Sequence, residues 1–434
     1  MSPIIAGIVG IVLLLLLFLI RMPVAFAMAF VGLVGFAYLT GPGPALSLLA
    51  QDVFEQFSSY PLTVIPMFIL MGTFAFASGI SQRLYKTTYT WVGQFRGGLT
   101  MATVFACAGF GAICGSSAAT AATMGKIALP EMEKYNYDKT LATGTVAAAG
   151  SLGILIPPST ILIVYGIMIE ESIGKLFIAG VLPGILLSLF FAATVVVLCL
   201  RNPSIGPPGD PTSWKEKLRA ITGIIPAIIL FLLAIGGLFL GWFSPTQAGA
   251  IGAGGALIIG LGRRQLTWQT FFEAGKEGLR TGCMVIFIIT GAVIFGHFMA
   301  VSTIPFKLAD WLGGLAIHRM AVMAVIIFIY FMGGFFMDSM GLVVVTIPIF
   351  FPVVLELGFD PIWFGVIIVL VAEMGVITPP VGVNVFVIKG IAPDIPIEVI
   401  FKGIFPFLVA LILVTIILVI FPEIATFLPS FITY

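Results

Sequence analysis

The sequence predicts an all-α polytopic membrane protein built from two inverted repeats, each with a re-entrant helical hairpin and a broken transmembrane helix. Of its 434 residues, 60% are hydrophobic and only 9% are charged, which excludes a soluble globular protein. Apolar runs of about 17–25 residues recur along the chain, and this is the length of a membrane helix. A helix-breaking motif occurs twice, as Ser151-Leu-Gly-Ile-Leu-Ile-Pro-Pro-Ser159 and as Glu373-Met-Gly-Val-Ile-Thr-Pro-Pro-Val381.

The two motifs belong to a longer internal repeat. A shift of 222 positions (117 to 339) superimposes five pairs of residues: Gly111 on Gly333, Ser117 on Ser339, Pro130 on Pro352, Asp138 on Asp360, and Gly153 on Gly375. Paired prolines break a helix because they lack backbone donors and clash with the preceding turn. At membrane depth a break is tolerated only inside protein or beside a watery cavity. Two breaks in matching halves therefore indicate a transporter's midplane binding site.

The apolar runs divide the chain into four predicted regions. Residues 1–60 carry scaffold helices at 4–20 and 23–40, followed by a loop at 41–60. The first inverted repeat, 61–200, contains a crossing at 62–80, a hairpin at 101–133, a broken helix at 140–169 and a helix at 177–200. Residues 201–280 contain a polar loop at 201–219, scaffold helices at 221–241 and 246–262, and an arm. The second inverted repeat, 281–434, contains a crossing at 282–300, a connection at 301–319, a hairpin at 321–357, a broken helix at 362–391 and a helix at 404–422.

The basic residues predict the orientation of the chain. With ten full crossings and the N-terminus outside, all but three of the 20 Lys and Arg residues fall on the cytoplasmic side, as the positive-inside rule requires. The exceptions are Lys175, Lys307 and Arg319. Both termini are then outside, and the hairpins enter from opposite sides, so the repeats are inverted. The first apolar run is too long, and lacks the flanks, for a signal peptide, so we expect a retained helix.

The remaining composition excludes several classes of site. A net charge of +1 gives no reason to expect nucleic acid as a partner. Four cysteines without a CxxC pair, and only two histidines, argue against a disulfide or a metal centre other than sodium. We expect His297, which lies in an apolar run, to be packed or interfacial rather than a proton relay.

The hairpin tips and broken helices together predict two equivalent sodium sites. Serine hydroxyls and the carbonyls of an unwound helix supply the oxygen ligands that a sodium ion needs. In the first half the predicted ligands are Ser116, Ser117, Gly153, Ile156 and Pro158. In the second half they are Asp338, Ser339, Gly375, Thr378 and Pro380. The alternative is that these small residues only pack helices together.

Three polar residues of the second half have open roles. An ionisable group at membrane depth is costly and indicates function, which makes Asp338 the strongest candidate. Its alternative is a hairpin cap or a salt bridge. Glu373, at the position equivalent to Ser151, is either a structural hydrogen-bond partner or part of a polar lining. Asn384 is either a ligand or a helix cap.

At these residues the chain resembles the large membrane subunit of tripartite ATP-independent periplasmic (TRAP) transporters, in the ion transporter superfamily. The specific marks are Cys114-Gly-Ser-Ser-Ala-Ala-Thr120, Gly153-Ile-Leu-Ile-Pro-Pro-Ser159, Met337-Asp-Ser339 and Gly375-Val-Ile-Thr-Pro-Pro380. The resemblance implies an elevator-type transporter in the inner membrane of a bacterium or archaeon, with sodium-coupled import of organic acids. It also implies two partners besides the lipid bilayer, a small four-helix membrane subunit on a separate polypeptide and a soluble periplasmic substrate-binding protein.

The resemblance also implies roles for particular residues. The tip serines and broken helices would hold sodium, and the substrate would be bordered by Cys114, Ser117, Ser159, Asp338 and Asn384. In sialic-acid members we expect serine at the position of Cys114, so the cysteine favours a C4-dicarboxylate, another carboxylate, or a sulfonate such as isethionate.

Three alternatives to this function remain at this point. One is a stand-alone sodium/organic-anion symporter. Another is a channel or sodium/proton antiporter acting through Asp338 and Glu373. The third is an intramembrane serine hydrolase using Ser116 or Ser117, although the chain lacks a GxSxG motif.

Overall fold

The computed structural model describes residues 2–314 and 318–432, and all regular secondary structure in these two ranges is helical. Five helical segments are long and apolar enough to cross a membrane, and two bent helix pairs raise that number to seven. The five are Lys139–Met168, Ile173–Arg201, Trp268–Ser302, Ser339–Glu356 and Ile397–Ile420. The prediction of an all-α, multi-pass fold is therefore confirmed.

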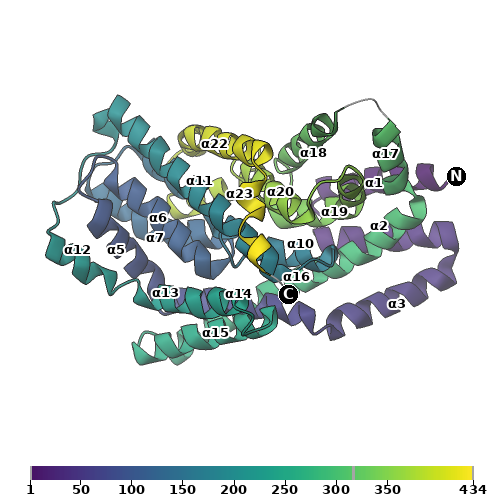
Figure 1. The fold of residues 1–434 in the computed structure, drawn as a ribbon, viewed down its shortest axis with the longest axis horizontal. Helices are drawn as coiled ribbons and strands as arrows, with labels where there is room; N and C mark the ends of the chain where they lie inside the picture. Colours follow the sequence, from purple (N-terminus) through teal and green to yellow (C-terminus); the bar gives the residue numbers. More distant parts are fainter. Residues whose placement is uncertain (1, 315–317, 433–434) are drawn as a thin grey trace.

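The two hairpins lie on opposite sides of the centre of the molecule along its long axis (Figure 1). The first consists of α6 (Gly98–Cys114) and α7 (Ser117–Lys134). The second consists of α18 (Arg319–Gly333) and α19 (Ser339–Glu356). Since the N-terminal bounds of α7 and α19 differ by the repeat shift, the second arms of the two hairpins are equivalent elements of the repeat.

Each hairpin is followed by a broken helix, as the paired prolines predict. The first is divided into α8 (Lys139–Ala149), α9 (Leu152–Leu155) and α10 (Thr160–Met168). The second is divided into α20 (Pro361–Val376) and α21 (Val383–Ile391). Both begin with an aspartate that caps the helix, because Asp138 accepts from the amide of Leu141 and Asp360 from that of Trp363, at 3.1 and 2.9 Å.

The remaining helices form the scaffold and its connections. They are α1 (Pro3–Leu19), α2 (Val24–Thr40), α3 (Pro42–Ser58), α4 (Val64–Ala77), α5 (Ile80–Val92), α11 (Ile173–Arg201), α12 (Trp214–Ile221), α13 (Ile225–Phe231), α14 (Gly237–Phe239), α15 (Pro245–Gly262), α16 (Trp268–Ser302), α17 (Ile304–Gly314), α22 (Ile397–Ile420) and α23 (Glu423–Thr426). A π-helical turn, Leu232–Gly236, joins α13 to α14.

The predicted loop at 41–60 is wrong, because this segment is the helix α3. Gly41, with φ of 101°, ends α2, and Pro42 opens α3 directly. The buried Asp52 of α3 pairs with His297 of α16, with 3.3 Å between Oδ1 and Nε2. His297 therefore has a carboxylate partner that its apolar surroundings in the sequence did not indicate.

Three further segments are more helical than predicted. The polar loop at 201–219 ends in α12, whose Ser213 and Glu216 form a reciprocal cap. The arm and the crossing at 282–300 are one continuous helix, α16, and the connection at 301–319 contains α17. Helices α12 and α17 are too short to contain a long apolar run, and the polar arm continues into the apolar part of α16. Hydrophobicity alone therefore did not reveal the bounds of these helices.

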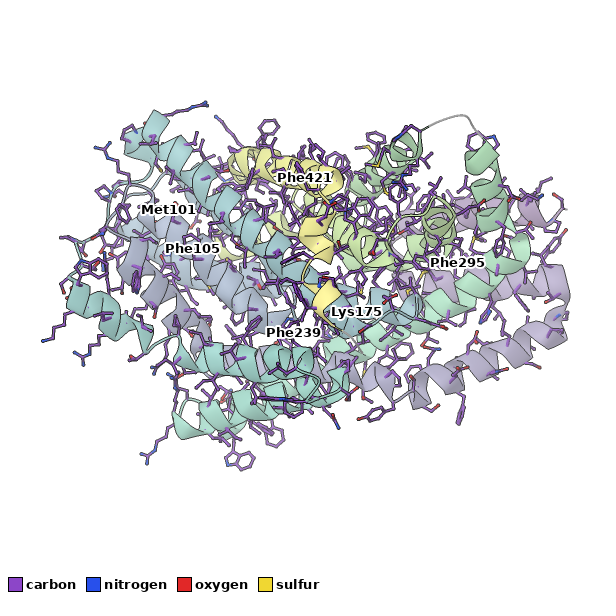
Figure 2. The ribbon with its side chains drawn as sticks, in the orientation of Figure 1. Met101, Phe105, Lys175, Phe239, Phe295 and Phe421 are labelled. Carbon is purple, nitrogen blue, oxygen red and sulfur yellow. The ribbon has the colours of Figure 1, made fainter. Side chains whose placement is uncertain are left out.

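The two halves interlock through equivalent helix pairs. Helix α2 packs against α16, and α15 packs against α4. These pairs match under the repeat shift, since α15 is the equivalent of α2 and α16 contains the equivalent of α4. A Cβ added at Gly32 would lie 2.7 Å from the Ile294 carbonyl carbon, so the backbones of α2 and α16 meet closely. Side chains fill the space between the ribbons, with Phe295 of α16 completely buried (Figure 2).

Prediction: Gly403→Ala lowers the thermal unfolding midpoint of the purified protein in detergent. A Cβ at Gly403 of α22 would collide with the Thr140 carbonyl oxygen of α8, and overpacking of this kind costs about 1–3 kcal/mol. The matched control is Gly254→Ala, because nothing lies within 4 Å of a Cβ built there. An unchanged or higher midpoint for Gly403→Ala would contradict the close crossing of α8 and α22.

Candidate functional site

The tips of both hairpins are formed by helix-capping residues. Gly115, with φ of 66°, ends α6, and the Ser116 side chain caps α7 by accepting from the Ala119 amide at 3.4 Å. In the second half the Asp338 carboxylate caps α19 by accepting from the Gly341 amide at 3.2 Å. Ser116 and Asp338 thus hold equivalent places. Asp338 is exposed and caps the hairpin tip, which is the structural role that we considered as the alternative to a functional one.

The two tips meet at one carboxylate, that of Glu373 on α20. The Ser117 hydroxyl donates to Oε1 of Glu373 at 3.3 Å, and the Ser339 hydroxyl donates to the same oxygen at 2.8 Å. Glu373 is only 1% exposed, and its Oε2 has no hydrogen-bond partner among the described residues. A buried carboxylate is costly unless it is protonated or paired, so this oxygen is free to accept a further hydrogen bond or to contact a cation.

Glu373 was not among the predicted site residues. The sequence signal for Glu373 was that an acidic residue lies at membrane depth. Nothing in the local sequence pattern indicated that both tip serines donate hydrogen bonds to it. The structure therefore connects the two predicted sodium sites, one in each half, through a shared acceptor.

The first break lies directly beneath the first tip. A Cβ added at Gly153 would lie 2.7 Å from the Ser116 carbonyl oxygen, and one added at Gly115 would lie 2.6 Å from the Pro158 carbonyl oxygen. Ser116, Gly153 and Pro158 are thus brought together as predicted neighbours. The Ile156 side chain faces away, toward Gly184 of α11.

Thr120 is a further polar residue at this tip. Its hydroxyl oxygen is buried without a hydrogen-bond partner among the described residues and would be in contact with a Cβ at Gly153. Thr120 lies one helical turn after Ser116, and this spacing is the signal that could have identified it.

The second helix break makes the same close backbone contact with its hairpin as the first, but its prolines are more exposed. A Cβ added at Gly334 would lie 2.8 Å from the Cα of Gly375, which corresponds to the approach of Gly111 to Gly153. The contact is made by Gly334 and not by Gly333, so the second hairpin slips by one residue from the repeat shift. The hydroxyl of Thr378 donates to the Met374 carbonyl. Pro380 is exposed, whereas its equivalent Pro158 is buried.

Asn384 connects the second break to the first repeat. Its Nδ2 donates to the Ala147 carbonyl of α8 at 3.2 Å, while its buried Oδ1 has no partner among the described residues. Gly382 occupies the N-cap position of α21, so Asn384 does not cap this helix, and its role as a ligand stays a prediction.

Cys114 and Ser159 are both predicted to border the substrate, but only Cys114 lines the cavity beside the first hairpin. Cys114 lines a cavity of about 290 Å³ between the first hairpin and the scaffold helices α4 and α16. Ser159 is buried and caps α10 by accepting from the Leu162 amide at 3.3 Å. The same cavity is lined by Lys126, Glu273 and Glu277, so it carries charges of both signs.

Known proteins are similar to this chain in sequence and in fold. The profile of the family described as "Tripartite ATP-independent periplasmic transporter, DctM component" matches residues 11–424. The C4-dicarboxylate TRAP transporter large permease protein of Pseudomonas aeruginosa is 36% identical over 88% of this chain and 89% of its own. The isethionate TRAP transporter permease protein of Oleidesulfovibrio alaskensis is 34% identical over 95% of this chain and 64% of its own.

The fold is similar to that of the YdaH transporter of Alcanivorax borkumensis, with a TM-score of 0.69 at 16% identity, over 95% of this chain and 98% of that one. The relatives are permeases and not enzymes, which overturns the hydrolase alternative. Ser116 also serves as a helix cap. The chain belongs to the large, DctM-type membrane component family of the tripartite ATP-independent periplasmic transporters.

Proposed function

We propose that the chain imports a small organic acid anion, a carboxylate or a sulfonate, across the inner membrane by sodium-coupled secondary active transport. The observation that carries this proposal is the meeting of Ser117 and Ser339 at the buried carboxylate of Glu373. A carboxylate with a free oxygen at membrane depth favours a cation beside it. The hairpin tips are the elements that sodium binding would then hold together.

The sodium ligands proposed for each half remain those predicted from the sequence, with Glu373 added between them. Hard oxygen donors suit a sodium ion, and the two hydroxyls and the carboxylate lie within one hydrogen-bonded group. The close approach of Ser116, Gly153 and Pro158 supports a site at the first break. The approach of Gly334 to Gly375 supports one at the second.

The cavity beside Cys114 supports a small anionic substrate. Its volume of about 290 Å³ is close to the lower end of the range of ligand pockets, and Lys126 supplies a positive charge there beside the carboxylates of Glu273 and Glu277. The names of the two relatives support a C4-dicarboxylate or a small sulfonate. Both substrates place a compact anionic group within reach of a cationic side chain.

The proposal includes the partners and the membrane orientation. The substrate is received from a soluble periplasmic binding protein, and a small four-helix membrane subunit accompanies this chain. The N- and C-termini lie outside the cytoplasm, as the distribution of basic residues favours. The hairpins and broken helices move together against the scaffold in an elevator motion.

Prediction: Glu373→Gln raises the sodium concentration for half-maximal uptake about tenfold or more. The glutamine amide keeps the size of the side chain and an acceptor for Ser117 and Ser339, but it removes the negative charge. Interactions with a charged group contribute about 1.5–3 kcal/mol, which corresponds to a tenfold or larger loss of sodium affinity. Uptake of labelled C4-dicarboxylate or isethionate into proteoliposomes containing both partners measures this. Glu356→Gln, the same change at an exposed carboxylate, is the control. Wild-type sodium dependence in Glu373→Gln would remove the carboxylate from the sodium site.

Prediction: Ser117→Ala and Ser339→Ala each reduce sodium-driven uptake, and the double variant loses less than the two single losses combined. The effects are non-additive because both hydroxyls donate to one oxygen. Ser188→Ala is the matched control, since this buried serine bonds only the Gly184 carbonyl of its own helix. Full additivity, measured as the free-energy change from initial rates, would show that the tips act independently.

Prediction: the reconstituted membrane subunits import no substrate until the soluble binding protein is added. In a tripartite system the binding protein delivers the anion to the permease. Robust uptake without it, under a sodium gradient, would favour the stand-alone symporter instead. Proton movement driven by sodium with no organic acid present would favour the antiporter.

A further inference from the structure

We propose that a cationic cavity between α5 and α12 binds the phosphate of an anionic phospholipid at the membrane surface. The cavity has a volume of about 530 Å³ and is lined by Arg83 and Lys86 of α5 and by Arg219 of α12. Nothing in the proposed transport site uses these residues. This inference is therefore independent of the substrate and of sodium.

The three cations have no anionic partner in the described residues. The single ion pair there joins His297 to Asp52, so Arg83, Lys86 and Arg219 have no carboxylate to neutralise them. Glu216 is the one acidic residue among those that line the cavity. Its Oε2 already accepts from the Ser213 amide at 2.7 Å and from the Ser213 hydroxyl at 2.8 Å.

A fourth cation strengthens the positive field near the cavity. Arg263, which follows the end of α15, has a buried Nη1 without a hydrogen-bond partner among the described residues. Burial and then the nearby positive charge of Arg83 lower the pKa of Arg263. Arg263 does not line the cavity, but its charge adds to that of Arg83, and such a concentration of guanidinium groups favours a nearby anion.

The position of α12 indicates that this anion belongs to a lipid. Helix α12 precedes the apolar segment Ile225–Phe239 with a bend of 40° between them. Because α12 is the charged end of this bent pair, with Lys215, Lys217 and Arg219, we place it at the membrane surface. Trp214 and Leu218, one turn apart, are 71% and 61% exposed and form an apolar face. Trp214 also contacts Trp91 edge to face, with 6.2 Å between the ring centroids. Exposed tryptophans beside basic residues are typical of a helix at the lipid headgroup level.

The cavity thus combines the two features of a headgroup site. The tryptophans and Leu218 hold α12 at the acyl boundary, while Arg219 faces the α5 cations across the cavity. In Figure 1, α5 and α12 lie together at the end of the molecule that also holds the base of the first hairpin. Basic pockets of this kind bind anionic headgroups in membrane proteins.

Native mass spectrometry of the purified full chain with its small subunit tests this proposal. The detergent-solubilised protein is titrated with phosphatidylglycerol and, separately, with phosphatidylcholine of the same acyl chains. We expect preferential binding of phosphatidylglycerol. Arg219→Gln and Arg83→Gln are each expected to weaken it about fivefold, the contribution of one basic residue beside an anionic surface. Lys215→Gln removes the same charge from an exposed position on α12 outside the cavity and should leave the affinity unchanged.

Three results would overturn the proposal. Equal binding of the two lipids would show that the headgroup charge is not recognised. Equal weakening by Lys215→Gln would indicate a diffuse surface effect and not a built cavity. Displacement of the lipid by inorganic phosphate at equal concentration would assign the cavity to a free anion. The thermal unfolding midpoint of each variant is measured alongside, and Lys86→Gln replaces Arg83→Gln if that variant does not fold.

Discussion

The hydroxyls of Ser117 and Ser339 share one acceptor, Oε1 of Glu373, and the arrangement of the two hairpin tips depends on this pair of hydrogen bonds. Hydrogen bonds to a charged group contribute about 1.5–3 kcal/mol each, roughly twice a neutral one. They join elements from both repeats, since the serines come from α7 and α19 and the carboxylate from α20. The buried Oε2 leaves the carboxylate only partly compensated. In the proposed transport cycle an added positive charge would satisfy this oxygen, and the packing of the tips would then depend on the occupancy of the site.

The two repeats share a backbone arrangement but differ in charge. Where the first repeat has Ser116 at the tip and Ser151 before the break, the second has Asp338 and Glu373. Both acids therefore belong to one repeat, although Glu373 reaches the tips of both. The breaks differ as well, because Pro158 is buried and Pro380 is exposed. A nearly symmetric frame thus carries an asymmetric site, which agrees with the proposal that a cation and an organic anion bind there.

Small residues decide how closely the frame can pack. Gly32 against Ile294, Gly111 against Gly153 and Gly334 against Gly375 are backbone approaches that a Cβ would obstruct. In a membrane the hydrophobic effect does not drive helices together, so such close van der Waals contacts provide much of the association. The connection between the halves is also held by backbone bonds, including one from the Gly97 amide to the Gly206 carbonyl at 2.9 Å. The segment that looks like a polar linker is therefore fastened to the base of the first hairpin.

The sequence by itself determined the membrane class, the internal repeat, the hairpins and the two helix breaks. These features depend on local chemistry, namely apolar runs of spanning length and the missing donors of paired prolines. It also indicated the tip serines and the family. The tertiary structure alone decided that Ser117 and Ser339, which are 222 positions apart, bind one carboxylate, and that Asp52 of an unpredicted helix pairs with His297. It likewise directed the Asn384 side chain to the Ala147 carbonyl, so that this residue does not cap its own helix. Such contacts depend on how distant segments pack, and a side chain's partner across the core leaves no periodic signal in its own neighbourhood.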